Sequence, residues 1–295
     1  MISPSARLDR WRQALLLPGE TDLLASSVTE LADYFGISRG EADKRAREGV
    51  QRTRDAWNAA PRRTRREIED FYNTSQDYIF ELVHWHATLS EAETLANVAA
   101  LEVAERLGAR RYLDFGGGVG ANLLLFAAAG IEVADADISD TLLAFARWRL
   151  ARRGVGASFF DLKTECLPSG QFDLLTAMDV LEHVPDPVAT LGSALPALAP
   201  RGHAIVALGF GFDPDRPMHL VHSPRKFLSG VRALGLERAR PRELRDFSFL
   251  RAYRRVERSR AVNRLVLAQD TLWEGARGMM RFAATLGRLV SGRVA

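Results

Sequence analysis

Cysteine and lysine are both scarce in this chain. Cys166 is the only cysteine among 295 residues, which excludes an internal disulfide and any cysteine-rich metal site. The only lysines are Lys44, Lys163 and Lys226, so arginine carries nearly all of the positive charge. A bias in genome base composition explains this preference without any role in binding nucleic acid.

Long hydrophobic runs are also missing. No apolar run reaches the roughly 18 residues that a membrane span requires. Residues 1–20 hold only a short apolar run between charged residues, so we expect no signal peptide and a cytoplasmic protein. A composition of 47% hydrophobic and 26% charged residues is ordinary for a globular protein. The length of 295 residues can hold one large α/β domain and a smaller addition.

Positive charge gathers in two short segments, although the formal net charge is only +3 and the sequence pI is near 9.3. Residues 62–66 and 251–260 are rich in arginine. Runs of this kind are more often solvated helix faces than phosphate-binding sites. We therefore expect no nucleic-acid partner, while an RNA or protein substrate is the alternative that these arginines leave open.

Residues 1–108 show helical patterns and no strand-like alternation, which predicts a helical N-terminal region. Within it, residues 29–47 resemble a helix-turn-helix, with an apolar helix, a glycine turn and a second helix capped by Ser38. The basic residues of that second helix lie where a DNA-binding protein places its contacts: Arg39, Lys44, Arg45 and Arg47. The same pattern suits a packed helix pair, so we favour a lid or a homodimer contact through these helices.

The most aromatic stretch of the chain, residues 71–86, mixes rings with polar groups. Such side chains suit a half-buried wall over a ligand. They suit equally well the packing of the N-terminal helices on a main domain. Both interpretations stay open at this point.

From residue 111 onward, short apolar strands alternate with helical segments, the pattern of a doubly wound parallel sheet. The predicted strands cover residues 112–115, 130–137, 157–160, 172–178 and 203–210, with 236–240 and 247–253 as a closing hairpin. Predicted helices include residues 119–129 and 187–198, and the fifth strand is entered through a turn at residues 200–202. We thus predict an α/β domain over residues 109–256 and a C-terminal helical extension over residues 257–295.

An apolar strand that enters a glycine-rich turn is the most informative pattern in the chain. It spans residues 111–120 and places Gly116, Gly118 and Gly120 directly before a long apolar helical run. Glycine lets the backbone approach a ligand closely and adopt positive φ, and the N–H groups at the helix start favour an electron-rich partner. This order predicts a nucleotide-like ligand at the turn.

Two kinds of ligand fit the turn. Its first two glycines, with Ala121 and with Asp137 about 20 residues further on, satisfy a dinucleotide-binding fingerprint. Against that interpretation, Asp114 directly before the glycines would repel a pyrophosphate, whereas it can accept a hydrogen bond from an ammonium group. Asp161 ends the third strand and can accept from an exocyclic amine such as that of adenine. Asp135 is expected to be a strand residue without a role.

Residues 110–210 resemble a class I S-adenosylmethionine-dependent methyltransferase. Residues 113–120 match the first motif of that family, although Gly117 stands where cysteine or serine is common. Residues 133–139 resemble its second-strand motif, and residues 172–183 include matches to its fourth strand and the loop that follows. The resemblance implies a Rossmann-like doubly wound sheet, the α/β fold of this class, with S-adenosylmethionine as the cofactor.

The resemblance also assigns cofactor contacts. Asp137 falls at the ribose-binding acid, and Asp161 with Leu162 falls at the pair that contacts adenine. A looser likeness to the segment before the fold in cyclopropane-fatty-acid-synthase-like methyltransferases, where Asn73 replaces an acid, implies that Tyr72 and Tyr78 cover the cofactor. The predicted cofactor-binding set is Asp114, Gly116, Gly118, Gly120, Asp137, Ile138, Asp161, Leu162, Asp179 and Tyr72.

Histidines supply the candidate catalytic residues. A general base is needed only when the acceptor loses a proton, as a hydroxyl does. His183 follows the fourth strand, while His219 and His222 follow the fifth, where related enzymes carry a loop over the acceptor pocket. All three are candidate bases and His219 is the favoured one, with structural packing as the alternative. His219 and His222 are spaced as metal ligands can be, but no third ligand lies nearby in the sequence, and we expect no metal.

These expectations describe an enzyme that transfers a methyl group in line from S-adenosylmethionine to a small organic acceptor, a secondary metabolite or lipid-like compound. His84, Trp85 and His86 are expected to line the apolar pocket for that acceptor. An RNA or protein methyltransferase is the alternative. A DNA-binding regulator with a nucleoside-binding domain is a third possibility.

Overall fold

The computed structural model describes residues 3–88, 90–211 and 217–256. The N-terminal part consists of helices α1 (Pro4–Leu15), α2 (Leu23–Phe35), α3 (Arg39–Ala59), α4 (Arg65–Thr74), α5 (Asp77–Thr88) and α6 (Glu91–Leu107). The strands that follow are β1 (Arg111–Phe115), β2 (Glu132–Asp137), β3 (Ala157–Asp161), β4 (Phe172–Ala177), β5 (Leu198–Ala207), β6 (Leu236–Ala239) and β7 (Leu250–Arg255). Between them lie helices α7 (Ala121–Ala127), α8 (Asp140–Ala151), α9 (Pro187–Ala194) and α10 (Pro224–Ala233). The predicted helices of residues 257–295 lie outside the described residues.

The strands form one seven-stranded sheet in the order β3-β2-β1-β4-β5-β7-β6. The first five are parallel, and β7 runs antiparallel between β5 and β6. The chain winds outward from β1 in one direction and from β4 in the other, so the switch point lies between these two strands. The predicted doubly wound α/β fold and the closing hairpin are both confirmed.

The fifth strand begins earlier than predicted. Leu198 already pairs with Phe172, and the register then shifts before the pairing resumes at His203. The predicted entry turn at residues 200–202 is therefore a bulge inside β5, with Arg201 at φ 66°. The preceding helix is shorter as a result, because α9 ends at Ala194 and a 3₁₀ turn (Leu195–Ala197) leads into the strand.

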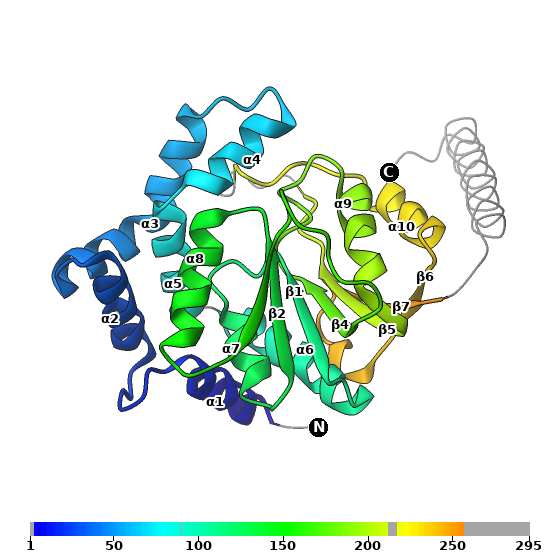
Figure 1. Ribbon diagram of the computed structural model, residues 1–295, viewed down its shortest axis with the longest axis horizontal. Coiled ribbons are helices and arrows are strands. Elements are labelled where there is room, and N and C mark those ends of the chain that lie inside the picture. Colours follow the sequence, from blue (N-terminus) through cyan, green and yellow to red (C-terminus); the bar gives the residue numbers. More distant parts are fainter. Residues whose placement is uncertain (1–2, 89, 212–216, 257–295) are drawn as a thin grey trace, which may run out of the picture.

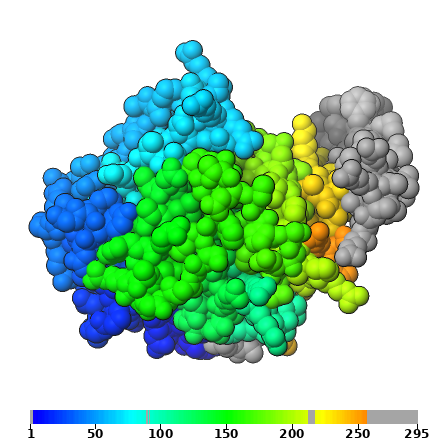
Figure 2. Space-filling view, viewed as in Figure 1, coloured from blue at the N-terminus to red at the C-terminus, as the bar shows by residue number. Residues whose placement is uncertain are grey.

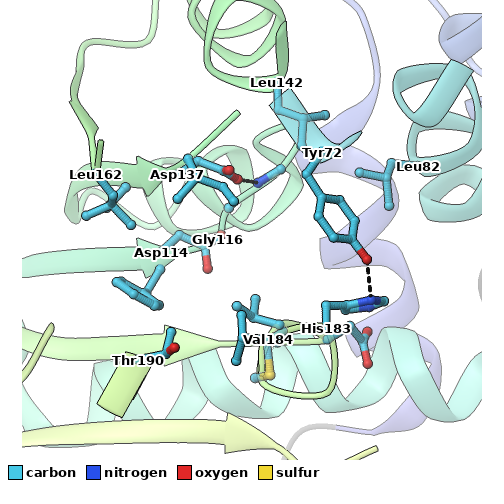
Figure 3. Close-up of a pocket in the computed structure, with 18 of the residues that line it drawn as sticks. Tyr72, Leu82, Asp114, Gly116, Asp137, Leu142, Leu162, His183, Val184 and Thr190 are labelled. Atoms are coloured by element: carbon cyan, nitrogen blue, oxygen red, sulfur yellow. Dashed lines mark hydrogen bonds between the residues drawn. The ribbon is translucent and has the colours of Figure 1, made fainter. Parts of the chain in front are cut away.

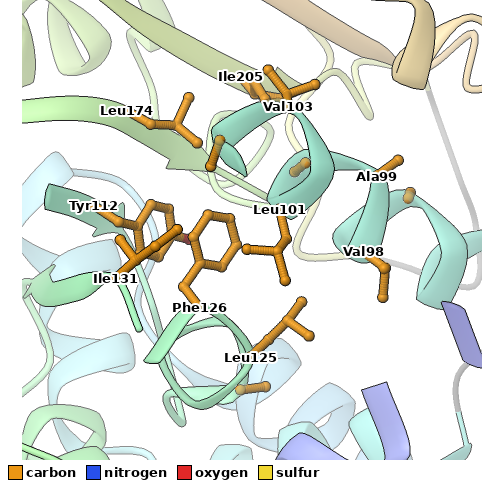
Figure 4. Close-up of a cluster of buried hydrophobic side chains, with 14 of the residues drawn as sticks. Val98, Ala99, Leu101, Val103, Tyr112, Leu125, Phe126, Ile131, Leu174 and Ile205 are labelled. Carbon is orange, nitrogen blue, oxygen red and sulfur yellow. The ribbon is translucent and has the colours of Figure 1, made fainter. Parts of the chain in front are cut away.

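Different helices cover the two faces of the sheet (Figure 1). On one face, α1, α6 and α7 enclose a core in which the rings of Phe126 and Tyr112 stack with centroids 3.7 Å apart (Figure 4). On the other face, α9 and α10 pack on β-strand residues such as Leu175 and Val206. Both faces are apolar because parallel strands are buried on both sides.

The remaining N-terminal helices pack against α8 through a third cluster that includes Leu31, Phe80 and Phe145. Figure 2 shows these helices, coloured blue to cyan, lying directly against the residues of the α/β part. A buried ion pair crosses this contact, since Arg149 of α8 donates to both carboxylate oxygens of Glu30 on α2 at 2.9–3.2 Å. The helices and the sheet therefore share one core.

The helix-turn-helix-like segment forms as the sequence predicts. Gly36 adopts φ 64° after α2, and the Ser38 hydroxyl accepts the N–H of Glu41 at the start of α3. Arg45, a candidate DNA contact, lies instead over the ring of Phe80 at 4.0 Å and pairs with Asp77 at 3.0 Å. These contacts favour packing of α3 on α5 as the role of this residue.

Replacing Phe126 by alanine tests the first core. Phe126 is fully buried, so Phe126→Ala should lower the free energy of unfolding by about 3–5 kcal/mol through lost contacts and a residual cavity. Phe249→Ala is the matched control, because this ring is 38% exposed and should cost clearly less. Urea denaturation of both variants measures the difference, and equal losses would contradict the assigned core.

Candidate functional site

A cavity of about 960 Å³ lies over the carboxyl ends of the parallel strands. Its floor comprises Gly116, Gly117 and Gly118 after β1, the end of β2, and the loops after β3 and β4. Its roof is built from helices α3, α4, α5 and α6. Open α/β sheets bind ligands at this edge, beside the switch point. Figure 3 shows several of these side chains converging on the space.

The glycine turn is folded tightly around the protein's own carboxylates. The N–H of Gly117 donates to Asp135 at 3.2 Å, and the N–H of Gly118 donates to Asp137 at 3.3 Å. A Cβ on Gly117 would lie 2.5 Å from Oδ1 of Asp135, so a larger residue here would displace this carboxylate from its present place. The turn's N–H groups are thus engaged by carboxylates, which disfavours the dinucleotide interpretation because a pyrophosphate would meet negative charge.

Asp114 is buried at the end of β1 in a chain of hydroxyl groups. Thr176 Oγ1 donates to it at 2.7 Å, and the hydroxyls of Thr176 and Tyr112 lie 2.5 Å apart. Burial raises the pKa of Asp114 to about 6, although these hydrogen bonds oppose the shift. A cationic ligand would restore the ionised form, so this carboxyl suits an ammonium group.

The carboxyls of Asp135 and Asp137 also titrate above their usual range. Burial raises the pKa of Asp135, and the neighbouring charge of Asp137 adds to the shift. Burial likewise raises the pKa of Asp137, against hydrogen bonds from the N–H groups of Ser139 and Gly118. Among the described residues, Oδ2 of Asp135 accepts no hydrogen bond. Of these two carboxyls, Asp137 lines the cavity, whereas Asp135 lies behind the turn and is fully buried.

The wall of the cavity also contains a buried acceptor without a partner. Asn122, on the first turn of α7, lines the cavity, and its Oδ1 accepts no hydrogen bond within the described part of the chain. An ammonium group can satisfy such an acceptor together with Asp114. Ile138 and Leu162 add apolar wall nearby, which suits the faces of a flat base. These residues fit S-adenosylmethionine, which has an ammonium group, a ribose and an adenine.

Helix α4 makes polar contacts with the loop after β4 and with the start of α8. The Tyr72 hydroxyl lies 2.9 Å from Nδ1 of His183 in the loop after β4 (Figure 3). On the other side, Asn73 accepts the N–H of Asp140 at 2.9 Å, at the start of α8. Burial raises the pKa of Tyr72 far above its usual value, so the phenol stays protonated. These contacts hold α4 across the ligand space.

Two of the histidines meet on the cavity wall. The rings of His183 and His219 are perpendicular, with centroids 4.8 Å apart. His222 packs instead against Phe210 at 5.1 Å and does not line the cavity. Asp179, which begins the loop that carries His183, has φ 51°, a left-handed conformation that aspartate tolerates better than most residues.

Most residues that the sequence nominated lie together on this wall: Tyr72, Asp114, Gly116, Gly118, Asp137, Ile138, Leu162, Asp179, His183 and His219. Gly120 lies apart, at the N-terminus of α7, where a Cβ would contact Leu150 at 3.0 Å. The carboxylate of Asp161 caps its own turn, accepting the N–H of Lys163 at 2.9 Å. Its contact with adenine stays a prediction.

The acceptor side of the wall is broader than predicted. Tyr78, Trp85 and His86 line the cavity, whereas His84 does not. Several of the residues that the sequence reasoning missed form two helical stripes: Arg65, Ile68 and Glu69 with Tyr72 on α4, and Glu81 and Leu82 with Tyr78 and Trp85 on α5. Both stripes follow i, i+3, i+4, i+7 spacing, so extending each helix face from its tyrosine would have found them.

Two searches of the described residues were negative. No group of three or more histidine, cysteine, aspartate or glutamate side chains in this part of the chain could hold a metal ion. No described helix is both long and apolar enough to cross a membrane.

Known proteins resemble this chain in sequence. A relative from Aromatoleum aromaticum, named ubiquinone biosynthesis O-methyltransferase, is 35% identical over 131 residues, which cover 41% of this chain and 56% of the relative. A relative of the same name from Ralstonia nicotianae is 31% identical over 132 residues, covering 42% of this chain and 56% of the relative. This chain therefore matches only about half the length of these relatives.

Among solved structures, magnesium protoporphyrin IX methyltransferase from Synechocystis is 19% identical, with a TM-score of 0.49, and covers 65% of this chain and 99% of that one. The model of a family described as a methyltransferase domain matches residues 60–248, more than half of the chain. The chain therefore belongs to the methyltransferase domain family, as its motifs predicted, and its cofactor is S-adenosylmethionine.

Proposed function

We propose that this protein transfers a methyl group from S-adenosylmethionine to a hydroxyl group of a small apolar acceptor. The observation that carries the proposal is the contact between Tyr72 and His183 on the wall of the cavity. It provides an oriented imidazole at the boundary between the cofactor residues and the roof helices. The relatives named as O-methyltransferases support oxygen as the methylated atom.

On this proposal, the carboxyl ends of β1 and β2 hold the cofactor. Asp137 accepts hydrogen bonds from the ribose, Asp114 and Asn122 accept from the ammonium group, and Ile138 and Leu162 flank the adenine. S-adenosylmethionine supplies an activated methyl group together with its own leaving group. The protein's task is then to orient the acceptor and to exclude water.

The proposed acceptor space lies under the roof helices. Ile68, Leu82, Met178, Val184 and Met218 give it apolar wall, beside the rings of Tyr72, Tyr78 and Trp85. These side chains favour a largely apolar molecule, while Arg65, Glu69 and Glu81 on the roof helices offer contacts for its polar groups. Helices α3–α6 serve as the lid over this space, which is the role that we propose for the N-terminal region. A homodimer through these helices and a cytoplasmic location remain predictions.

His183 is the proposed base. When its Nδ1–H donates to the Tyr72 oxygen, Nε2 is the ring atom that takes the proton of the acceptor hydroxyl. The Tyr72 phenol stays neutral over the ordinary pH range, so it can accept from Nδ1–H or donate to Nδ1, and the proposal requires the first of these arrangements. His219, perpendicular to His183, positions the ring from the other side.

Removing Asp137 tests the cofactor site. Asp137→Ala should abolish binding of S-adenosylhomocysteine in calorimetry, because the ribose loses its acceptor and the turn loses a hydrogen bond at Gly118. The fold should survive, since burial disfavours this ionised carboxyl. Asp173→Ala is the control, because Asp173 accepts the N–H groups of Arg110 and Arg111 away from the cavity. Unchanged affinity in Asp137→Ala would contradict the ribose placement.

The raised pKa of Asp114 predicts how binding depends on pH. A ligand ammonium prefers the ionised carboxyl, so affinity for S-adenosylhomocysteine should fall as the pH drops below about 6. In the unbound chain, this group binds a proton more tightly when folded than when unfolded, where its pKa is about 3.9. Its contribution to stability therefore decreases as the pH rises from about 4 to about 6.

Calorimetry in buffers of different ionisation enthalpy measures the proton released when S-adenosylhomocysteine binds near pH 6. The variant Asp114→Asn cannot ionise at this position and should bind weakly with a flat pH profile. A native profile that is also flat across this range would contradict the proposed contact between Asp114 and the ammonium group.

Removing the imidazole tests the proposed base. His183→Ala should lower kcat by about 10²–10⁴-fold, the usual contribution of a general base, while the affinity for S-adenosylhomocysteine changes little. Tyr72→Phe should lower kcat less and shift its pH profile. The readout is a mass gain of one methyl group in a panel of catechols and alkyl phenols.

His222→Ala is the matched control for these variants, because this ring lies outside the cavity wall and should leave kcat unchanged. Full activity of His183→Ala would rule out its role as base. A turnover that falls steeply with salt would instead favour an RNA or protein substrate, since phosphate contacts release counterions.

A further inference from the structure

The peptide group between Val119 and Gly120 lies in the glycine turn, with a glycine on each side of Val119. Gly118 and Gly120, on either side of Val119, have φ of 58° and 75°. Glycine permits many other backbone conformations, so these two residues do not fix the direction of the intervening peptide groups themselves. The N–H of Gly118 donates to Asp137, so the direction of this backbone bears directly on the proposed ribose site.

One side chain holds the turn at this point. Nη1 of Arg149 donates to the carbonyl oxygen of Val119 at 3.1 Å. A guanidinium forms strong charge-assisted hydrogen bonds in fixed directions, so it can hold a carbonyl in one orientation. Arg149 also lies on α8, and the adjacent Leu150 packs in the core that includes the strand residues Tyr112 and Val133.

A buried guanidinium needs a buried counter-charge. Arg149 and Glu30 are both 0% exposed, and the two groups share hydrogen bonds at 2.9–3.2 Å. Without Glu30 the positive charge of Arg149 would be uncompensated, since Arg153, the other partner of Glu30, is a cation as well. Glu30 lies on α2, outside the residues that match the family.

We infer that Arg149 is a positioning residue for the cofactor turn and that Glu30 fixes it in place. Helix α2 of the N-terminal region thereby sets the orientation of the Val119 carbonyl. It supports cofactor binding although it lies outside residues 60–248, which match the methyltransferase domain family. This inference rests on the proposed function, because the turn must hold the cofactor for its geometry to matter.

The main test removes the buried charges without leaving any unpaired. Glu30→Met, Arg149→Met and Arg153→Met are combined, because apolar replacement of a whole buried ion cluster often preserves stability. S-adenosylhomocysteine should bind about tenfold or more weakly in calorimetry, as expected when a charge-assisted hydrogen bond no longer orders the site. A cooperative urea transition verifies that the triple variant is folded.

The chain offers a matched control. Arg7 and Glu102 form another buried ion pair, at 2.5 Å, which joins α1 to α6 and does not contact the turn. Arg7→Met combined with Glu102→Met should leave the affinity for S-adenosylhomocysteine within about twofold. A loss equal to that of the triple variant would mean that any buried ion pair matters in the same way, and would overturn the inference.

Arg149→Lys keeps the inference testable if the triple variant does not fold. Lysine keeps the charge that pairs with Glu30, but its single nitrogen lacks the planar fork that holds the Val119 carbonyl and the Glu30 carboxylate in fixed directions at once. The affinity should again fall about tenfold, whereas Arg153→Met should match the native chain. Affinity within about twofold of native in Arg149→Lys overturns the inference.

Hydrogen exchange of the Gly118 and Gly120 amides separates this inference from the proposed function. If the native chain binds no S-adenosylhomocysteine, the proposed function fails. Even then, faster amide exchange in Arg149→Lys than in the Arg7/Glu102 double variant would support the inference that Arg149 keeps the glycine turn in one conformation. Equal exchange in these two variants overturns it.

Discussion

Three carboxyl groups share a small buried space at the ends of two adjacent strands, and the site is organised around them. Asp114 ends β1, while Asp135 and Asp137 lie in β2, and all three are almost fully buried. The missing side chain of Gly117 brings its N–H within reach of Asp135. The backbone satisfies part of this carboxyl cluster. On the proposed function, the ammonium and ribose hydroxyl groups of the cofactor would satisfy Asp114 and Asp137, which line the cavity.

The sequence predicted the parts of the site that arise locally. The strands, the glycine turn and Asp114 and Asp137 follow from short patterns, because strand ends and tight turns are determined by neighbouring residues. The fifth strand was misjudged at its start because a bulge holds a proline and a glycine that resemble a turn. Asp135 was given no role, since nothing in a strand pattern shows that a turn will fold back onto it.

The roof of the cavity and the buried ion pair could not be predicted in this way. Glu30 and Arg149 are separated by 119 positions, and neither carries a local signal that it is buried or paired. Their contact depends on how α2 docks on α8, which is a property of the whole fold. The stripes on α4 and α5 were detectable as helix faces, but only the tertiary structure shows which face meets the ligand.

The hydrogen bond between Tyr72 and His183 couples the orientation of the proposed base to the position of helix α4 over the cavity. On the proposed function, the imidazole is oriented only while α4 lies across the cavity, because its partner hydroxyl belongs to that helix. An open lid would leave the base without the hydroxyl group that orients its ring, and a closed lid would retain the product. Turnover would then depend on the opening rate of α4 as well as on the methyl-transfer barrier, a balance common in enzymes with lids. Strengthening the contact would slow product release, and weakening it would leave an imidazole that is poorly aligned for proton transfer.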